Sequence, residues 1–161
     1  TGGATIACLQ GGAEVVHVDG SKTAITQATR NAELSGVKEK PVRWIPDDVR
    51  KFVEREIKRG VKYDAIIMDP PAFGHGAKKE VWKIEKDLIE LIDLTKKILS
   101  DKPLFYILNG YASGYSSVAY AQNLEWLTQK HEGTIEFGEL LFEEKDSNRL
   151  LPAGITARWS N

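Results

Sequence analysis

Short β-rich runs alternate with longer helical runs along this chain of 161 residues, and the alternation limits the fold more than any other feature. Most of the β-rich runs are apolar at consecutive positions, as strands buried on both faces are. Strands that alternate with helices form a parallel sheet that helices cover on both faces. We therefore predict one α/β domain over residues 1–161. The expected strands are residues 14–18, 42–45, 63–68, 104–108, 134–142 and 155–159.

The expected helices begin at residues with suitable local chemistry. Ser21 suits the N-cap of a helix over 22–34, and Asp47 or Asp48 can cap the next helix. The segment 69–79 contains two prolines and two glycines and is expected to be a loop. The other expected helices are residues 4–10, 49–58, 81–99, with Trp82 in its first turn, and 116–129.

The two ends of the predicted sheet are unusual. The polar segment 143–149 is too short to hold a crossover helix, so the last two strands are expected to form an antiparallel pair. An ordinary dinucleotide-binding fold does not end in such a hairpin. At the other end, the turn Thr1-Gly2-Gly3 leads into the first helix, although a turn of this kind normally follows a central strand. We therefore expect the first central strand to be absent from this chain and to belong to a longer protein, because its two neighbours would otherwise keep unpaired edges.

Charge and composition exclude several classes of protein. The chain has 22 basic and 23 acidic side chains, for a net charge of −1. A chain that binds nucleic acid by itself usually carries a basic excess, so a nucleic-acid substrate would need a local patch or another segment to help. The one cysteine, Cys8, forms no intramolecular disulfide and leaves no metal-site pattern. With no membrane span or signal peptide in view, we expect a cytoplasmic protein with no metal and no membrane partner.

Glycines and carboxylates follow the expected strands at positions that suit a nucleotide-like ligand. The glycine turn allows close approach of a ligand and points free N–H groups at a pyrophosphate or a carboxylate, although a plain tight turn is the alternative. Asp19 ends the run EVVHV, 16 residues beyond Gly3, where an acidic residue can accept hydrogen bonds from ribose hydroxyls. Asp47 or Asp48 can accept from the exocyclic amine of adenine. Each carboxylate can instead cap a turn or helix, and one of the last pair is expected to do only that.

The most informative motif is Asp69-Pro70-Pro71-Ala72-Phe73, directly after the run YDAIIM. Two consecutive prolines cannot continue a sheet or a helix interior, so they fix a stiff turn at the carboxyl end of a strand. Ligands of open α/β sheets bind at that edge. Asp69 would stand rigidly at the rim, and Phe73 could stack on a planar base. The alternative is a structural turn with a capping aspartate.

Several residues near these edges allow two interpretations. His75 could be a base or a substrate contact, or simply a solvated loop residue. Lys78 and Lys79 could meet phosphate or remain solvated. Tyr111 and Tyr115 follow the fourth expected strand, and Tyr111 could line a target pocket or pack in the core.

Four stretches of sequence carry a family resemblance. TGGATIACLQGGAEVVHVDGSK, the pair Asp47-Asp48, DPPAFGHGAKKEVW and LLPAGITARW resemble the catalytic domain of a bacterial S-adenosylmethionine-dependent methyltransferase family. That family is related to the large-subunit rRNA cytosine-C5 and guanine-N7 methyltransferases. The resemblance spans essentially the whole chain and implies a Rossmann-like class I methyltransferase sheet, mostly parallel, with a C-terminal antiparallel hairpin.

The resemblance also implies roles for the residues. S-adenosyl-L-methionine would be the cofactor and an RNA nucleobase, in rRNA, the acceptor. The family's usual N-terminal part is not visible, so RNA binding would need help from a segment outside this chain. The implied cofactor residues, from the methionine end through ribose to adenine, are Thr1, Gly2, Gly3, Asp19, Ser21, Lys22, Asp47, Asp48 and Asp69. The implied catalytic residues on the side of the target base are Asp69, Pro70, Pro71 and Phe73.

One departure bears on the chemistry. Methylation at C5 of cytosine needs a cysteine nucleophile, and Cys8 falls in the first expected helix, far in sequence from Asp69. We expect Cys8 to pack as a small core residue. The methyl group is expected to go to a nitrogen, by positioning of the acceptor alone. Two alternatives stay open: a nicotinamide-dependent oxidoreductase, which the missing G-x-G-x-x-G disfavours, and a non-catalytic module that only binds cofactor. A protein or a small molecule is the alternative acceptor.

Overall fold

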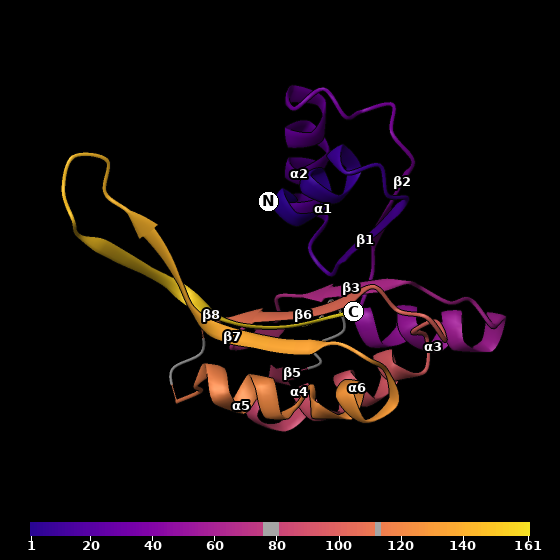
Figure 1. Ribbon diagram of the computed structural model, residues 1–161. Coiled ribbons are helices and arrows are strands. Elements are labelled where there is room, and N and C mark those ends of the chain that lie inside the picture. Colours follow the sequence, from indigo (N-terminus) through magenta and orange to yellow (C-terminus); the bar gives the residue numbers. More distant parts are fainter. Residues whose placement is uncertain (76–80, 112–113) are drawn as a thin grey trace. The chain divides into compact units, whose positions relative to one another are not determined.

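The computed structural model describes residues 1–75, 81–111 and 114–161, and the chain divides into two compact units. Unit 1 comprises residues 1–58 and unit 2 residues 59–161. Lys78, Lys79 and the side chain of His75 lie outside the described residues. Each unit has its own sheet, and both belong to the α/β class (Figure 1).

Unit 1 is built on a pair of parallel strands, β1 (Val15–Asp19) and β2 (Val42–Pro46). The register places Asp19 beside Pro46 at the carboxyl end of the pair. Helices α1 (Gly3–Gln10) and α2 (Lys22–Leu34) precede and follow β1, and α3 (Val49–Arg59) follows β2. One hydrophobic cluster in unit 1 consists of buried Leu9, Ala32 and Val37, with Ile6, Val15, Val42 and Trp44 packed against it.

Local hydrogen bonds confirm the predicted helix starts in unit 1. The Ser21 hydroxyl accepts a hydrogen bond from the backbone N–H of Ala24 at 3.2 Å, which caps α2. The Asp48 carboxylate accepts from the N–H of Lys51 at 3.1 Å, so Asp48 is the capping member of the aspartate pair. In each cap the acceptor and the donor lie three positions apart in the sequence, so the sequence pattern was sufficient to predict them.

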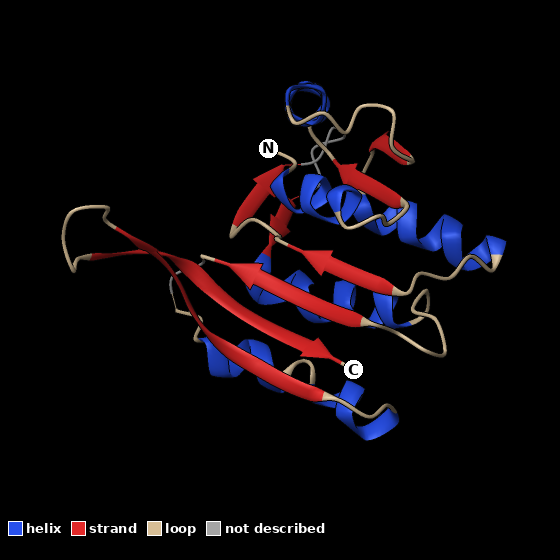
Figure 2. Cartoon of the chain, turned by 45° about the horizontal axis from the view of Figure 1, so that its top comes forward, coloured by secondary structure: helices blue, strands red, loops and turns tan. Residues whose placement is uncertain are grey.

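Unit 2 contains a four-stranded sheet in the order β3-β6-β8-β7. Strands β3 (Ala65–Met68) and β6 (Phe105–Gly110) are parallel, whereas β8 (Leu150–Ser160) is antiparallel to both β6 and β7 (Thr134–Glu143). The predicted closing hairpin is therefore confirmed, and Figure 2 shows the four strands side by side with the β7–β8 loop at the far end. Within the described residues, β1 has only β2 as a neighbour and β3 only β6.

Helices α4 (Ile84–Lys96), α5 (Ser117–Gln122) and α6 (Glu125–Lys130) lie on one face of this sheet (Figure 1). Alternate residues of β6 are buried, because that strand turns one face toward the helices. The Tyr106 hydroxyl is hydrogen-bonded to the Thr95 hydroxyl at 2.7 Å, which pairs a polar group inside the core. The largest fully buried side chains of unit 2 include Trp159, Tyr106, Tyr120, Leu88, Ile92, Leu108, Leu124 and Leu127.

The expected loop over 69–79 is partly wrong. Strands β4 (Phe73–His75) and β5 (Val81–Lys83) form an antiparallel pair, and α4 begins only at Ile84. Trp82 therefore lies in a strand and not in the first turn of a helix, and its indole N–H donates to the Pro71 carbonyl at 2.6 Å. The helical spacing of apolar residues after Val81 masked this pairing, since the pairing joins residues that are not neighbours in sequence.

The single helix expected over 116–129 is also wrong, because α5 and α6 are separate helices. The side-chain amide of Asn123 donates to the Ala119 carbonyl at 2.8 Å and competes for the acceptor that continues the helix. The next backbone bond, from Leu124 to Ala121 at 2.9 Å, spans only three residues. The tightened turn ends α5. None of the described helices is long and apolar enough to cross a membrane.

Candidate functional site

The glycine turn at the start of α1 packs against α2 at Gly2 and leaves the backbone open at Gly3. Gly2 is left-handed, with φ of 85°, and a Cβ there would lie 2.8 Å from the Cβ of Ala28 in α2. A Cβ on Gly3 would meet nothing within 4 Å, so a ligand can approach the backbone at that position. No side chain caps α1, and its first N–H groups favour an anionic group. These residues fit the carboxylate of a methionine moiety.

Asp19 holds a fixed orientation at the carboxyl end of β1. One of its carboxylate oxygens accepts a hydrogen bond from the backbone N–H of Ser21 at 2.7 Å. Its carbonyl accepts from the N–H of Asp47 at 3.1 Å, which joins the ends of β1 and β2. Asp19 is half-buried, whereas Ser21 and Lys22 are exposed beside it. A carboxylate anchored in this way is suited to accept hydrogen bonds from a pair of vicinal hydroxyls.

The aspartate pair after β2 is already engaged within unit 1. The Asp47 carboxylate accepts from the N–H of Asp48 at 2.8 Å and forms an ion pair with Arg55. The hydrogen bond from Arg55 holds the pKa of Asp47 below its usual range, so Asp47 stays ionised. Asp48 caps α3. The role of either residue in binding adenine stays a prediction.

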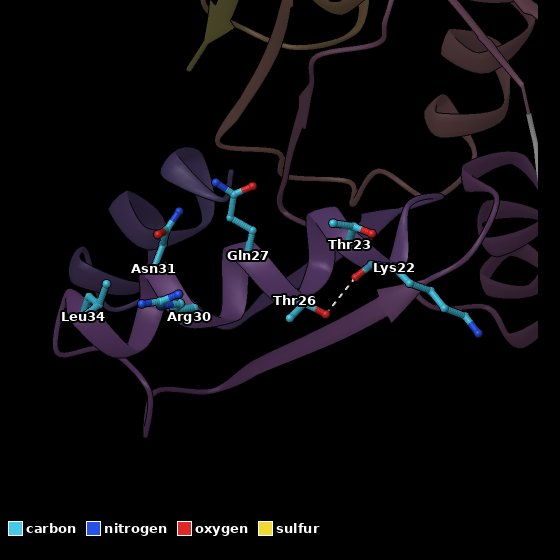
Figure 3. Close-up of a pocket in the computed structure, with 7 residues that line it drawn as sticks. All are labelled: Lys22, Thr23, Thr26, Gln27, Arg30, Asn31 and Leu34. Atoms are coloured by element: carbon cyan, nitrogen blue, oxygen red, sulfur yellow. Dashed lines mark hydrogen bonds between the residues drawn. The ribbon is translucent and has the colours of Figure 1, made fainter.

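A shallow hollow runs along the exposed side of α2 (Figure 3). Lys22 is the one predicted site residue in its lining. The Thr26 hydroxyl donates to the Lys22 carbonyl at 3.0 Å, a bond within the helix. All lining residues come from this single helix: Lys22, Thr23, Thr26, Gln27, Arg30, Asn31 and Leu34. The hollow is therefore the solvated side of an amphipathic helix, and the glycine turn and Asp19 do not line it.

In unit 2, Asp69 directly follows β3, and the two prolines hold the chain there. Pro70 is buried, whereas Asp69, Pro71 and Phe73 are exposed. The bond from Trp82 to the Pro71 carbonyl ties the turn to β5. Desolvation raises the pKa of Asp69 above its ordinary value, which makes this carboxylate a better proton acceptor when ionised. The ring of Phe73 is 52% exposed, so it is available to a planar partner.

The end of β6 shares this edge of the sheet with Asp69. Met68 pairs with Leu108 in the parallel register, so the residues after Leu108 run beside the start of the proline turn. Tyr111 is 70% exposed and does not pack in the core. Sequence reasoning missed Tyr120, whose ring packs against Gly110, because an aromatic residue at helical spacing usually belongs to the core. A glycine at the end of a strand was the available signal for such a close contact.

Cys8 lies in α1 of unit 1, as expected, and is half-buried. Burial raises the pKa of its thiol, so little reactive thiolate is present near neutral pH. This side chain has none of the features of an activated nucleophile.

The parallel strands covered by helices, the closing antiparallel hairpin, the glycine turn and the carboxylates at the strand ends are features of the class I methyltransferase fold. The model of a methyltransferase family described as RNA cap guanine-N2 methyltransferase matches residues 1–107. The chain belongs to this family.

Curated relatives and solved structures agree with this assignment. The ribosomal RNA large subunit methyltransferase I of Aeromonas salmonicida is 46% identical over 74 residues, which are 45% of this chain and 19% of that protein. The ribosomal RNA large subunit methyltransferase K of Neisseria meningitidis serogroup B is 32% identical over 115 residues, 70% of this chain and 32% of that protein. The chain thus spans about a fifth to a third of the length of these relatives.

A solved structure matches nearly the whole chain. The SAM-dependent methyltransferase from Agrobacterium tumefaciens superimposes with a TM-score of 0.90 and 36% identity, over 99% of this chain and 52% of that protein. The oxidoreductase alternative is not favoured by these relatives.

Proposed function

We propose that residues 1–161 form one methyltransferase catalytic domain that transfers a methyl group from S-adenosylmethionine to a nitrogen of a nucleobase in rRNA. The observation that carries this proposal is the turn after β3. Asp69 stands at a strand end, buried Pro70 and the Trp82 bond hold the turn, and Phe73 offers an exposed ring. Family membership and the names of the rRNA methyltransferase relatives support the choice of RNA.

Unit 1 would supply the cofactor site. The backbone of Thr1, Gly2 and Gly3 would receive the methionine end, and Asp19 would accept from the ribose hydroxyls, with Ser21 and Lys22 beside it. Asp47 or Asp48 would accept from the adenine amine. When bound, S-adenosylmethionine supplies an electrophilic methyl group on a positively charged sulfur.

Unit 2 would supply the acceptor site. Phe73 would stack on the target base while Pro70 and Pro71 keep the turn stiff. Asp69 would accept a hydrogen bond from the acceptor amine and take the proton that this nitrogen loses, a role that its raised pKa favours. Orientation of a nitrogen toward the methyl group supplies much of the rate in such a transfer.

Nitrogen is the proposed acceptor atom because methylation at C5 of cytosine needs a cysteine nucleophile, and Cys8 does not have the features of one. Cys8 is the one cysteine, and burial raises the pKa of its thiol. The net charge of −1 provides no general attraction to RNA, so a further RNA-binding segment would assist this domain. An rRNA acceptor would place the reaction in the cytoplasm.

Calorimetric titration of S-adenosylhomocysteine and a transfer assay together test the proposal. We expect micromolar binding to the wild-type protein and a loss of about 100-fold in the Asp19→Ala variant, since a charge-assisted pair of hydrogen bonds disappears. Tritiated S-adenosylmethionine with unmodified transcripts of large-subunit rRNA should then give an N-methylated nucleoside. A folded protein that binds no S-adenosylhomocysteine would refute the cofactor site, and a 5-methylcytosine product would refute the acceptor chemistry.

A further inference from the structure

The hydroxyl of Tyr120 is buried and has no hydrogen-bond partner among the described residues. Tyr120 lies in α5 and its side chain is fully buried, with an exposed fraction of 0%. A phenol in a protein core normally finds a partner, because an unpaired polar group loses its hydration without compensation. An unpaired hydroxyl therefore calls for an explanation in terms of function.

Its position distinguishes this hydroxyl from the other unpaired groups. An ideal Cβ on Gly110 would lie 2.3 Å from the Tyr120 hydroxyl oxygen, so the phenol rests directly on the bare backbone at the end of β6. Because β3 and β6 are parallel and pair at Met68 and Leu108, this end lies at the edge of the sheet where Asp69 stands. The unpaired Ser100 hydroxyl lies at the opposite end of the sheet, where the Ser100 N–H donates to the Tyr63 carbonyl ahead of β3. The unpaired indole nitrogens belong to Trp126 and Trp159, whose rings contact those of Tyr106 and His131.

Electrostatics link the two side chains. Burial raises the pKa of Tyr120, and the neighbouring Tyr115 and Asp69 raise it further. The phenol is therefore protonated at neutral pH and can only be a donor toward a carboxylate. The centroid of the Tyr115 ring lies 5.7 Å from that of Tyr120, and the two rings are tilted by 58°.

We propose that Tyr120 is a positioning residue of the acceptor site, whose hydroxyl donates a hydrogen bond to one bound water that in turn donates to the Asp69 carboxylate. This inference rests on the proposed function, in which Asp69 accepts from the acceptor amine. The bond would leave the other carboxylate oxygen turned toward that amine. Gly110 is the residue that makes room for the hydroxyl, since any larger side chain would displace it.

The first test compares Tyr120→Phe with Tyr115→Phe, which removes a neighbouring phenol hydroxyl of the same kind. With tritiated S-adenosylmethionine and large-subunit rRNA transcripts, we expect Tyr120→Phe to lower kcat about tenfold and to leave the KM for S-adenosylmethionine unchanged. The melting temperature should stay equal or rise, because an unpaired buried hydroxyl is removed. Tyr115→Phe should retain the wild-type kcat.

Two further measurements separate a positioning role from a structural one. Titration of the Asp69 carboxyl carbon by NMR should show a higher pKa in Tyr120→Phe than in the wild type, since a hydrogen bond to the charged form is lost. The Asp69→Asn and Tyr120→Phe losses in kcat should be strongly non-additive, because one residue acts through the other. Gly110→Ala should lower kcat as Tyr120→Phe does and leave the binding of S-adenosylhomocysteine intact.

Three results would overturn the inference: an unchanged pKa of Asp69 in Tyr120→Phe, additive losses in the double variant, or an equal loss of kcat in Tyr115→Phe. A wild-type protein without methyl transfer would refute the proposed function instead, and the NMR titration would still decide the link between Tyr120 and Asp69.

Discussion

The hydroxyl of Thr5 in α1 is hydrogen-bonded to Nδ1 of His17 in β1, at 2.7 Å. The bond ties the helix that begins at the glycine turn to the strand that ends at Asp19, and Thr5 is buried. We predict that Thr5→Val lowers the free energy of unfolding by about 1 kcal/mol, because the His17 nitrogen loses its partner. Affinity for S-adenosylhomocysteine should fall by about fivefold, because a loss of about 1 kcal/mol in binding free energy corresponds to that factor. Thr23→Val, on the exposed side of α2, is the control and should change neither; calorimetry and thermal melting check both.

His17 also predicts how stability depends on pH. Burial lowers its pKa from 6.5, and the opposing effect of Asp19 is smaller. The unfolded chain therefore binds a proton at a higher pH than the folded protein does. This stabilising contribution is complete above about pH 6.5 and is lost as the pH falls through the lowered pKa of the folded state. Urea titrations between pH 7 and pH 5 should show a smaller loss of stability in His17→Gln than in the wild type, and equal slopes would contradict the assignment.

The two glycines of the first turn should respond differently to alanine. Gly2→Ala places a Cβ 2.8 Å from that of Ala28 and forces a left-handed residue to carry a side chain. We expect it to cost about 1–3 kcal/mol of stability. A Cβ on Gly3 meets nothing within 4 Å of the protein, so Gly3→Ala should melt as the wild type does. If Gly3 lines the cofactor site, Gly3→Ala should still weaken the binding of S-adenosylhomocysteine; unchanged affinity would place the cofactor elsewhere.

Features encoded by neighbouring residues were predictable from the sequence. The start of α2 follows from Ser21, which directly precedes the helix and accepts a hydrogen bond from Ala24, and the closing hairpin follows from a connection too short for a helix. The glycine turn and the proline turn were recognisable for the same reason, since backbone restrictions at Gly2, Pro70 and Pro71 are properties of the residues themselves.

Features that depend on partners distant in sequence were not predictable. The β4–β5 pair joins Phe73 to Lys83, and the apolar spacing after Val81 continues into α4 without a visible break. In the sequence, Tyr120 cannot be told from any other aromatic residue of the core. What sets it apart is the contact of its hydroxyl with Gly110, which lies in another element. The side-chain pattern of a helix reports which residues are buried, not what lies opposite them.

Trp82 offers a direct test of the stiffness of the proline turn. Its indole N–H donates to the Pro71 carbonyl at 2.6 Å, and phenylalanine at this position would keep an aromatic ring but remove the donor. We predict that Trp82→Phe lowers kcat for methyl transfer about tenfold, because a looser turn holds Asp69 and the target base less well aligned. Affinity for S-adenosylhomocysteine should stay unchanged, since the proposed cofactor residues Gly2, Gly3 and Asp19 belong to unit 1.

Trp126→Phe is the matched control for this prediction, because the indole nitrogen of Trp126 has no partner among the described residues. It removes the same group from the same unit without touching the proline turn, and it should retain the wild-type kcat. If both variants lose activity equally, the loss reflects general packing of unit 2. If only Trp82→Phe loses activity and its melting temperature stays close to that of the wild type, the hydrogen bond to Pro71 acts by holding the acceptor side of the site.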